Sequence, residues 1–521
     1  MTKFIETLKK ERTQHIISIG ILLLTFLYIA LYIISTAYFK KACMSADSAE
    51  YMKAAHALLT GHGFISNYAS NDTTWFALWP IGYPALIAFF TLISGADIYL
   101  ASKIFSLFAV ALTLFLLYRR FGKDAWFFSL ALLNPGYIWL NCYTWSEGPF
   151  TLFTLMFALS LSAVIVDDKK KAGIIDYCIL GFITIANFLV RYVGAYTAPV
   201  IFAAAFVLIL IYHFDKDSRT DELKAKIKGL IITASASSAF MLLYLLNNKI
   251  RNGASTGVNR AVFTDDIPTL AFSLVEALIK EFFNAFLIIP PILVSDINGP
   301  KLRTLLLLLL LTIPVFIVYK KFSKKDKLLV ILATGLFYYL TFITIRFNST
   351  MDPFGPRFFE PATFVITVAI LGYIAKTGFF KTVKPLIAVM IAGITLLNSL
   401  SIIKNTDFSN PYYSSLINQN KMQYEGIPEE STVAYFYWDD LYIAASYSYN
   451  YNLVSVEASD TPNTLFNKLS DYDSIYFTRA AIENYVLSDA VQLTPEMKEY
   501  LNDIYSENFE NTDKNFVRIE F

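Results

Sequence analysis

The feature that most constrains this chain is a series of apolar runs, each about 20 residues long, separated by short charged segments. A run of that length crosses the hydrocarbon core of a bilayer as a helix, because a helix satisfies its own backbone hydrogen bonds. Of the 521 residues, 55% are hydrophobic and 16% are charged, and the mean hydropathy is +0.49. These values exclude an ordinary soluble domain. The sequence predicts a polytopic α-helical membrane protein.

Basic loops give each run a direction, because short segments rich in Lys and Arg stay on the cytoplasmic side. The N-terminus carries Lys9, Lys10 and Arg12 before the first run, and no small-residue cleavage pattern follows that run, so we predict a retained helix rather than a cleaved signal peptide. About eleven spans are expected, near residues 16–39, 98–118, 124–140, 148–166, 174–190, 195–213, 229–246, 305–319, 327–345, 361–377 and 383–403. An odd number leaves the C-terminus outside.

Two outer segments are predicted to lie at the membrane surface without crossing. The long first outer loop, residues 40–97, contains an apolar stretch at 84–94 that is too short to cross, so we expect an interfacial helix there. A second helix, near 270–289, is placed along the outer surface because the run at 305–319 must still enter. Its charged residues, expected along one side, are Glu276, Lys280 and Glu281. A crossing at 270–289 would invert everything that follows.

The last part of the chain differs from the rest in charge and pattern. From Asn405 onward there are 19 Asp and Glu against 6 Lys and Arg, a net charge of −13, whereas the remainder carries +14. Short apolar stretches begin at Ser431, Asn452 and Ser474 between turn residues and helical segments, which favours a small α/β domain. We therefore predict a membrane domain at 1–404 and a soluble extracytoplasmic domain at 405–521. The acidic tail argues against nucleic acid as a partner.

Cysteine and histidine give no strong metal signal. Cys43, Cys142 and Cys178 are scattered and match neither a disulfide framework nor a zinc site. His56 and His62 are the histidines expected outside, six residues apart with Asp47 nearby. A metal site there is less favoured than ordinary helix-surface and loop roles.

A short helix predicted after the first span carries a candidate base. Asp47, Glu50 and Tyr51 have helical spacing, and Gly61 and Gly63 end the helix. A carboxylate that is partly desolvated at the membrane boundary can have a raised pKa and act as a general base. The alternative is N-terminal capping of this helix by Asp47 or by Ser48.

Charged residues at predicted outer helix ends form a second candidate group. Glu147 begins one span, Arg191 and Tyr192 end another, and Arg346 and Arg357 flank the turn before the span at 361–377. Lys and Arg are usually enriched on the cytoplasmic side, so an arginine on the outer side requires a partner. A phosphate fits, because guanidinium binds it in a forked geometry. Salt bridges to Glu147 or Asp47, or contact with lipid headgroups, are the alternatives.

Several short motifs in order resemble those of one enzyme class. They are Asp47-x-x-x-Tyr51-x-x-x-Ala55-x-x-Leu58-x-x-Gly61-x-Gly63, Trp79-Pro-Ile-Gly-Tyr-Pro-Ala-Leu, Leu189-Val-Arg191-Tyr192 and Pro356-Arg357-Phe358. Together, in this order and on a common outer face, they resemble the GT-C class of glycosyltransferases, which includes protein O-mannosyltransferases and the lipid A aminoarabinose transferase. The likeness covers the membrane part of the chain.

The resemblance implies transfer of a sugar, with inversion, from a polyprenyl-phosphate donor to an extracytoplasmic lipid, glycan or protein acceptor. It implies that Asp47 is the base, with Glu50 or Glu147 as a second carboxylate, because Ser48 stands where many members have an acid. It implies that Arg191 and Arg357 hold the donor phosphate, together with Tyr192 and Arg346. The substrate-loop residues would be Tyr51, His56, His62 and Tyr83. The need for a divalent metal stays open.

Two other classes of membrane protein share some of these features. A membrane glycan polymerase or ligase would also need outer arginines, but it would place its long outer loop late rather than directly after the first span. A transporter with an outer sensing domain would show related halves and polar residues near mid-membrane. The favoured interpretation implies a multi-pass protein of the plasma or inner membrane, with the N-terminus cytoplasmic and the C-terminal domain outside.

Overall fold

Helices dominate the computed structural model, which describes residues 11–41, 43–66, 74–166, 172–215, 219–257, 266–287, 326–348, 354–428, 431–436, 451–456, 459–468, 473–488 and 493–520. Contacts divide the chain into two units. The first comprises Met1–Ile33, Ala77–Tyr83 and Lys103–Asn405, and the second comprises Ile34–Phe76, Pro84–Ser102 and Thr406–Phe521. We describe each by itself.

Nine of the eleven predicted spans form continuous helices among the described residues. They are α2 (Glu11–Ile34), α5 (Ile98–Phe121), α8 (Glu147–Val166), α9 (Ile174–Val190), α10 (Thr197–Phe214), α11 (Asp221–Asn252), α15 (Lys327–Asn348), α16 (Pro356–Ala375) and α17 (Gly378–Lys404). Within the described residues, 8 helical segments are long and apolar enough to cross a membrane, and α9 is shorter. The polytopic helical fold is therefore confirmed. The predicted span at 305–319 lies outside the described residues.

The predicted span at 124–140 is not one continuous helix. That segment is broken into a 3₁₀-helix, η2 (Gly122–Phe128), and two short helices, α6 (Ser129–Leu132) and α7 (Pro135–Cys142). The break has a local cause, because a residue before proline is disfavoured in helical conformation. Asn134 leaves the helix and caps α7, its side chain accepting a hydrogen bond from the amide of Gly136. Hydropathy does not detect this interruption, since the segment is apolar throughout.

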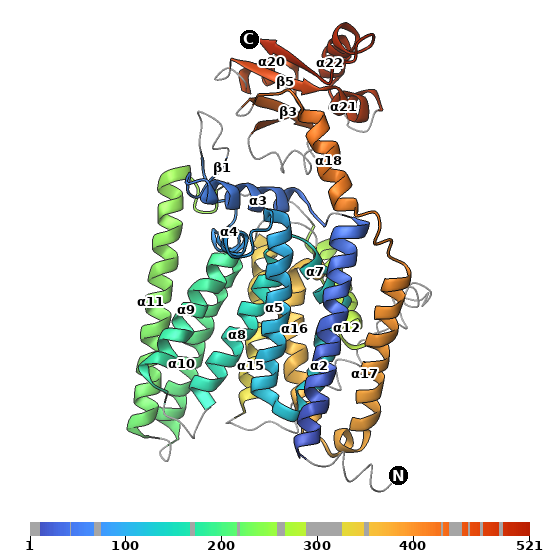
Figure 1. The fold of residues 1–521 in the computed structure, drawn as a ribbon. Coiled ribbons are helices and arrows are strands. Elements are labelled where there is room, and N and C mark those ends of the chain that lie inside the picture. Colours follow the sequence, from blue (N-terminus) through green and yellow to red (C-terminus); the bar gives the residue numbers. More distant parts are fainter. Residues whose placement is uncertain are drawn as a thin grey trace. The chain divides into compact units, whose positions relative to one another are not determined.

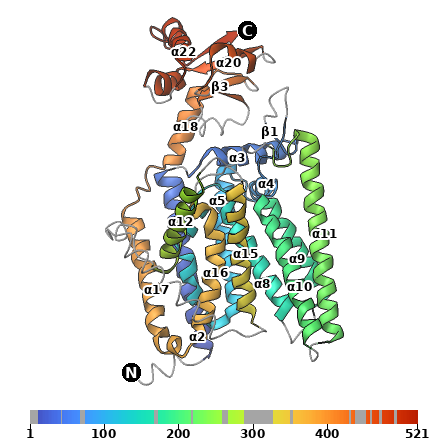
Figure 2. The ribbon, with the colours of Figure 1, turned by 180° about the vertical axis from the view of Figure 1, so that it is seen from behind.

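Helix α16 is the most enclosed of the candidate spans. Of its most apolar window, 89% is buried, against 11% for α17. It packs along α15 and α8 within the first unit, while α9, α10 and α11 pack on one another. Figures 1 and 2 show α15 beside α16 from opposite sides. Polar side chains on α16 are therefore shielded from lipid.

The helix predicted near 270–289 is present as α12 (Ile267–Leu287), which packs against α16, α6 and α7. Glu276 and Lys280 form an exposed ion pair with 2.7 Å between Lys280 Nζ and Glu276 Oε1. Glu281 is 1% exposed, so the expectation that all three residues share one side is wrong. Positions 276 and 280 lie four apart on one face, whereas 281 is turned about 100° from 280.

The second unit joins residues 34–76 and 84–102 to the helix that opens the tail. Its elements here are the π-helix η1 (Ser35–Lys40), α3 (Ala46–Leu59), the hairpin β1 (Ile65–Ser66) and β2 (Thr74–Trp75), most of α4 (Gly82–Ser94), and α18 (Tyr412–Tyr424). Tyr413 of α18 stacks on Tyr99, with 4.8 Å between ring centroids. Its hydroxyl donates to Asp97 Oδ1 at 2.9 Å.

The remaining tail forms a four-stranded sheet with strand order β4-β3-β5-β6. The predicted strands are β3 (Thr432–Phe436), β4 (Asn452–Val456) and β5 (Ser474–Thr478), joined by the unpredicted β6 (Phe516–Glu520). Strands β4, β3 and β5 run parallel, and β6 is antiparallel to β5. The helices that accompany the sheet are α20 (Pro462–Lys468), α21 (Arg479–Ala481), η5 (Ile482–Leu487) and α22 (Pro495–Asn508). Buried Phe477, Met497 and Leu501 belong to one core, so this segment is α/β in class.

Candidate functional site

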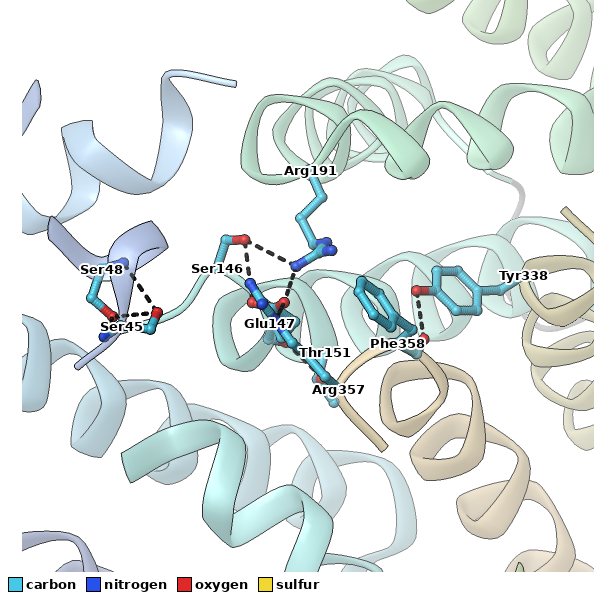
Figure 3. A network of polar contacts seen from close by, with 9 residues as sticks. All are labelled: Ser45, Ser48, Ser146, Glu147, Thr151, Arg191, Tyr338, Arg357 and Phe358. Carbon is cyan, nitrogen blue, oxygen red and sulfur yellow. Dashed lines mark hydrogen bonds and ion pairs between the residues drawn. The ribbon is translucent and has the colours of Figure 1, made fainter. Parts of the chain in front are cut away.

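A buried glutamate receives two arginines in the first unit. Glu147 is the first residue of α8 and is 1% exposed. Its Oε1 forms ion pairs with Nη1 of Arg191 and with Nε of Arg357. Figure 3 shows the two arginine side chains reaching Glu147 from separate elements. The salt-bridge alternative for both arginines is thus present in the structure.

Arg191 is placed by the way α9 ends. The helix stops at Val190, and Arg191 is extended with φ −148° and ψ 136°, directly before the 3₁₀-helix η3 (Tyr192–Tyr196). This sharp change of direction turns the side chain toward α8, where Nη1 also donates to Ser146 Oγ at 3.2 Å. The Ser146 hydroxyl in turn lies 3.5 Å from Glu147 Oε2.

The turn that carries Arg191 depends on Gly194. A Cβ at that position would meet the Asn187 carbonyl and lie 2.7 Å from the Phe188 amide nitrogen. Gly194→Ala is therefore expected to destabilise the protein by about 1–3 kcal/mol, measured as a lower thermal unfolding midpoint in detergent. Gly393→Ala, where nothing lies within 4 Å, is the matched control and should not lower it. An unchanged midpoint for Gly194→Ala would contradict this account of the turn.

Arg357 lies in the first turn of α16, after Pro356 at the start of the helix. Its guanidinium carbon is 4.4 Å from the centroid of the Trp145 ring and 5.7 Å from that of Phe358. Arg191 approaches the same Phe358 ring at 5.8 Å. The Phe358 carbonyl accepts a hydrogen bond from the Tyr338 hydroxyl at 2.8 Å. Aromatic rings thus support both guanidinium groups, which lowers the cost of ordering them.

Together Glu147, Arg191 and Arg357 carry a formal charge of +1 in a mostly buried place. The arginine side chains are 14% and 19% exposed, so water screens them little. Two guanidinium groups that converge on one oxygen can also converge on an anion with forked acceptors, such as a phosphate. The chemistry available here is recognition of an anion and stabilisation of developing negative charge.

Three other predicted residues of this unit lie elsewhere. Tyr192 donates to the Ala77 carbonyl at 2.7 Å and accepts from Asn248, so it ties the segment at 77–83 to α11. Arg346 is buried in the last turn of α15 and lies 5.9 Å from the Phe354 ring centroid. Tyr83 is fully buried. Among the residues that the structure describes, neither Arg346 nor Tyr192 pairs with Glu147.

The remaining predicted residues belong to the second unit, on or just after α3. Ser45 caps this helix and forms a capping box with Ser48, so Asp47, in the first turn, is not the capping residue. Glu50 pairs with Lys53 at 3.5 Å, and Tyr51 is fully buried. Burial, and secondly the neighbouring His62, lower the pKa of His56.

Sequence reasoning missed the residues that surround the two arginines. Trp145 and Ser146 stand directly before Glu147 in the motif Trp-Ser-Glu, but we assigned them no role there. A tryptophan and a hydroxyl next to a predicted buried acid were the available signal. The described residues contain no group of three or more His, Cys, Asp or Glu side chains that could hold a metal ion.

Comparison with known proteins places the fold. No protein-family model matches the sequence, and no curated protein matches it. Solved structures do match. The apo crystal structure of ArnT from Cupriavidus metallidurans has a TM-score of 0.54 at 10% identity over 89% of this chain and 94% of that one. The apo oligosaccharyltransferase of Archaeoglobus fulgidus has a TM-score of 0.51 at 11% identity over 94% and 72%.

These likenesses show the fold. The chain has the fold of the GT-C membrane glycosyltransferases. The same ArnT bound to undecaprenyl phosphate matches with a TM-score of 0.50 at 9% identity over 89% of this chain and 94% of that one. Identities this low establish the fold and leave the activity to be argued from the site.

Proposed function

We propose that this protein is a membrane glycosyltransferase that moves a sugar from a polyprenyl-phosphate donor to an extracytoplasmic acceptor, with inversion at the anomeric carbon. The observation that carries the proposal is the convergence of Arg191 and Arg357 on buried Glu147 in a chain with the GT-C fold. The ArnT structure that contains undecaprenyl phosphate supports a lipid phosphate as the donor class. We further propose that the protein lies in the plasma or inner membrane with its acidic tail outside.

In this proposal the arginines act on the leaving group. The donor is a phosphate diester with one negative charge, and the departing polyprenyl phosphate gains charge as the bond from the anomeric carbon to oxygen breaks. Arg191 and Arg357 stabilise that developing charge in a place that excludes most water. Glu147 holds the two guanidinium groups together before the donor arrives, so their geometry is set in advance.

The base is proposed from the sequence resemblance. Asp47 removes the proton of the acceptor hydroxyl while that oxygen attacks the anomeric carbon, so the electron pair of the broken bond leaves with the phosphate.

A divalent metal forms no part of this scheme. Two guanidinium groups can supply the same charge stabilisation.

The proposal is tested with the purified full-length protein and a polyprenyl-phosphate hexose labelled in the sugar. Envelope lipid, glycan and protein fractions serve separately as acceptors. We expect label to leave the polyprenyl fraction and appear in one acceptor fraction, with release of polyprenyl phosphate. Donor binding without transfer to any fraction would favour a transporter instead, and absence of binding would remove the donor class.

A further inference from the structure

Two glutamates meet away from the Glu147 cluster, one from each of two packed helices. Glu281 lies in α12 and is 1% exposed, and Glu360 lies in α16 and is fully buried. A pair of buried carboxyl groups is costly unless something offsets the charge. The pair takes no part in the mechanism above, so its presence needs its own explanation.

Among the described residues, each glutamate of the pair accepts a hydrogen bond at only one of its two carboxyl oxygens. Asn134 Nδ2 donates to Glu360 Oε2 at 2.6 Å, and Thr363 Oγ1 donates to Glu281 Oε1 at 3.3 Å. Glu281 Oε2 and Glu360 Oε1 have no such partner among the described residues. Because Thr363 lies one turn after Glu360 on α16 and binds the Glu281 carboxyl, the two carboxyl groups face each other across the contact between α12 and α16.

Two carboxyl groups that face each other need a proton to form a hydrogen bond, because an ionised carboxylate has only acceptors. Within the part of the chain that the structure describes, neither glutamate has an ion pair with a basic side chain. The other titratable groups that face the pair are phenols, Tyr339 of α15 and Tyr137 of α7. Two unshared negative charges would repel each other in apolar surroundings, so one bound proton is the arrangement that the contacts support.

The pair also lies next to the turn that carries Arg357. Glu360 follows Arg357 by three residues, and Pro361 has no amide hydrogen to donate to the Arg357 carbonyl four residues earlier. The first turn of α16 therefore lacks one of its own backbone hydrogen bonds. Side-chain contacts from Asn134 and from Glu281 hold this turn from outside.

We propose that Glu281 and Glu360 bind one proton between them, and that the protonated pair fastens α12 to the first turns of α16 and so positions Arg357. Both glutamates are positioning residues. The part that concerns Arg357 as a phosphate ligand rests on the proposed function, whereas the shared proton does not.

The proton is tested directly by infrared spectroscopy of the full-length protein, with carbon-13 labelled glutamate to identify the band. Wild type at neutral pH is expected to show the carbonyl band of a protonated, buried glutamic acid, and both Glu281→Gln and Glu360→Gln should remove it. Glu276→Gln, on the exposed side of the same helix, should retain it. A band absent from wild type, or unchanged in both variants, would overturn the proposal. So would a carboxylate spectrum that changes when a chelator removes divalent cations, since a cation would then bridge the pair.

The fastening of the helices is tested by thermal unfolding between about pH 5 and about pH 9. Wild type should lose stability as the pH rises and the shared proton leaves. Over this range its unfolding midpoint should fall by at least about 2 °C more than the midpoint of Glu281→Gln falls. The glutamine amide donates to Glu360 without a titratable proton, so this variant should change less with pH. Identical curves for wild type and Glu281→Gln would count against the inference.

The link to Arg357 is tested by binding of polyprenyl phosphate. Glu360→Leu is expected to weaken this binding by about 2- to 30-fold. Wild type should bind more weakly at alkaline pH than at neutral pH. Glu360→Gln should bind like wild type at neutral pH and keep that affinity at alkaline pH. Equal affinity in Glu360→Leu and wild type would remove the positioning role. If wild type does not bind polyprenyl phosphate at all, the proposed function fails while the infrared result still decides the proton.

Discussion

Asp47→Asn is expected to lower turnover by about 10²- to 10⁴-fold while leaving the affinity for polyprenyl phosphate within about twofold of wild type. Asparagine has nearly the shape of aspartate but cannot accept the proton of an acceptor hydroxyl, so the loss should fall on kcat. The measurement is transfer of labelled sugar at saturating donor, together with separate titration of polyprenyl phosphate.

Ser45→Ala is the matched control for this change. Ser45 caps the same helix, so its removal costs about 1 kcal/mol of helix stability without altering a carboxylate. Turnover should survive in Ser45→Ala and fail in Asp47→Asn. Normal turnover in Asp47→Asn would show that the base lies elsewhere, and equal losses in both variants would mean that only the helix matters.

Arg357→Ala should weaken binding of polyprenyl phosphate by about 30- to 1,000-fold, equivalent to about 2–4 kcal/mol, because it removes one of two guanidinium groups from a poorly hydrated site. Activity should be lost with the binding. Arg357→Lys keeps the charge but not the fork, so it should recover only part of the affinity. Direct titration with the lipid phosphate, followed by transfer assays, measures both effects.

Arg251→Ala serves as the control for Arg357→Ala, since Arg251 is an exposed arginine in the last turn of α11. It should bind and turn over like wild type. If Arg357→Ala kept wild-type affinity, the residue would be a structural partner of Glu147 and nothing more. The unfolding midpoint of Arg357→Ala must also be measured, because Glu147 would then rely on Arg191 alone.

The sequence predicted well those features that depend on local pattern. Length and apolarity located nine of the long helices, among them α2, α5 and α17, because a span needs about 20 mostly apolar residues and a helix pairs its own backbone groups. Period-two apolar stretches located β3, β4 and β5. The break at Asn134 was missed because a hydropathy window averages over a proline whose effect lies in one backbone angle.

The site was predicted only in part, for a different reason. Arg191 and Arg357 were singled out by their unusual place at the predicted outer ends of helices, and Glu147 was named among their partners. Nothing in the local sequence separated Arg346 from these two arginines, although the structure places it against Phe354 and not against Glu147. Pairing is set by how α8, α9 and α16 pack, and residues 147 and 357 lie 210 positions apart. Burial of Glu281 was likewise decided by a neighbouring helix and not by its own.

Because both arginines contact the same oxygen of Glu147, their energetic contributions cannot be independent. Loss of either one leaves the carboxylate with a remaining cation, whereas loss of both leaves a fully buried charge with its principal counterions gone. The double change should therefore cost more than the sum of the single ones. In divergent relatives of this chain, the three positions are expected to change together or not at all.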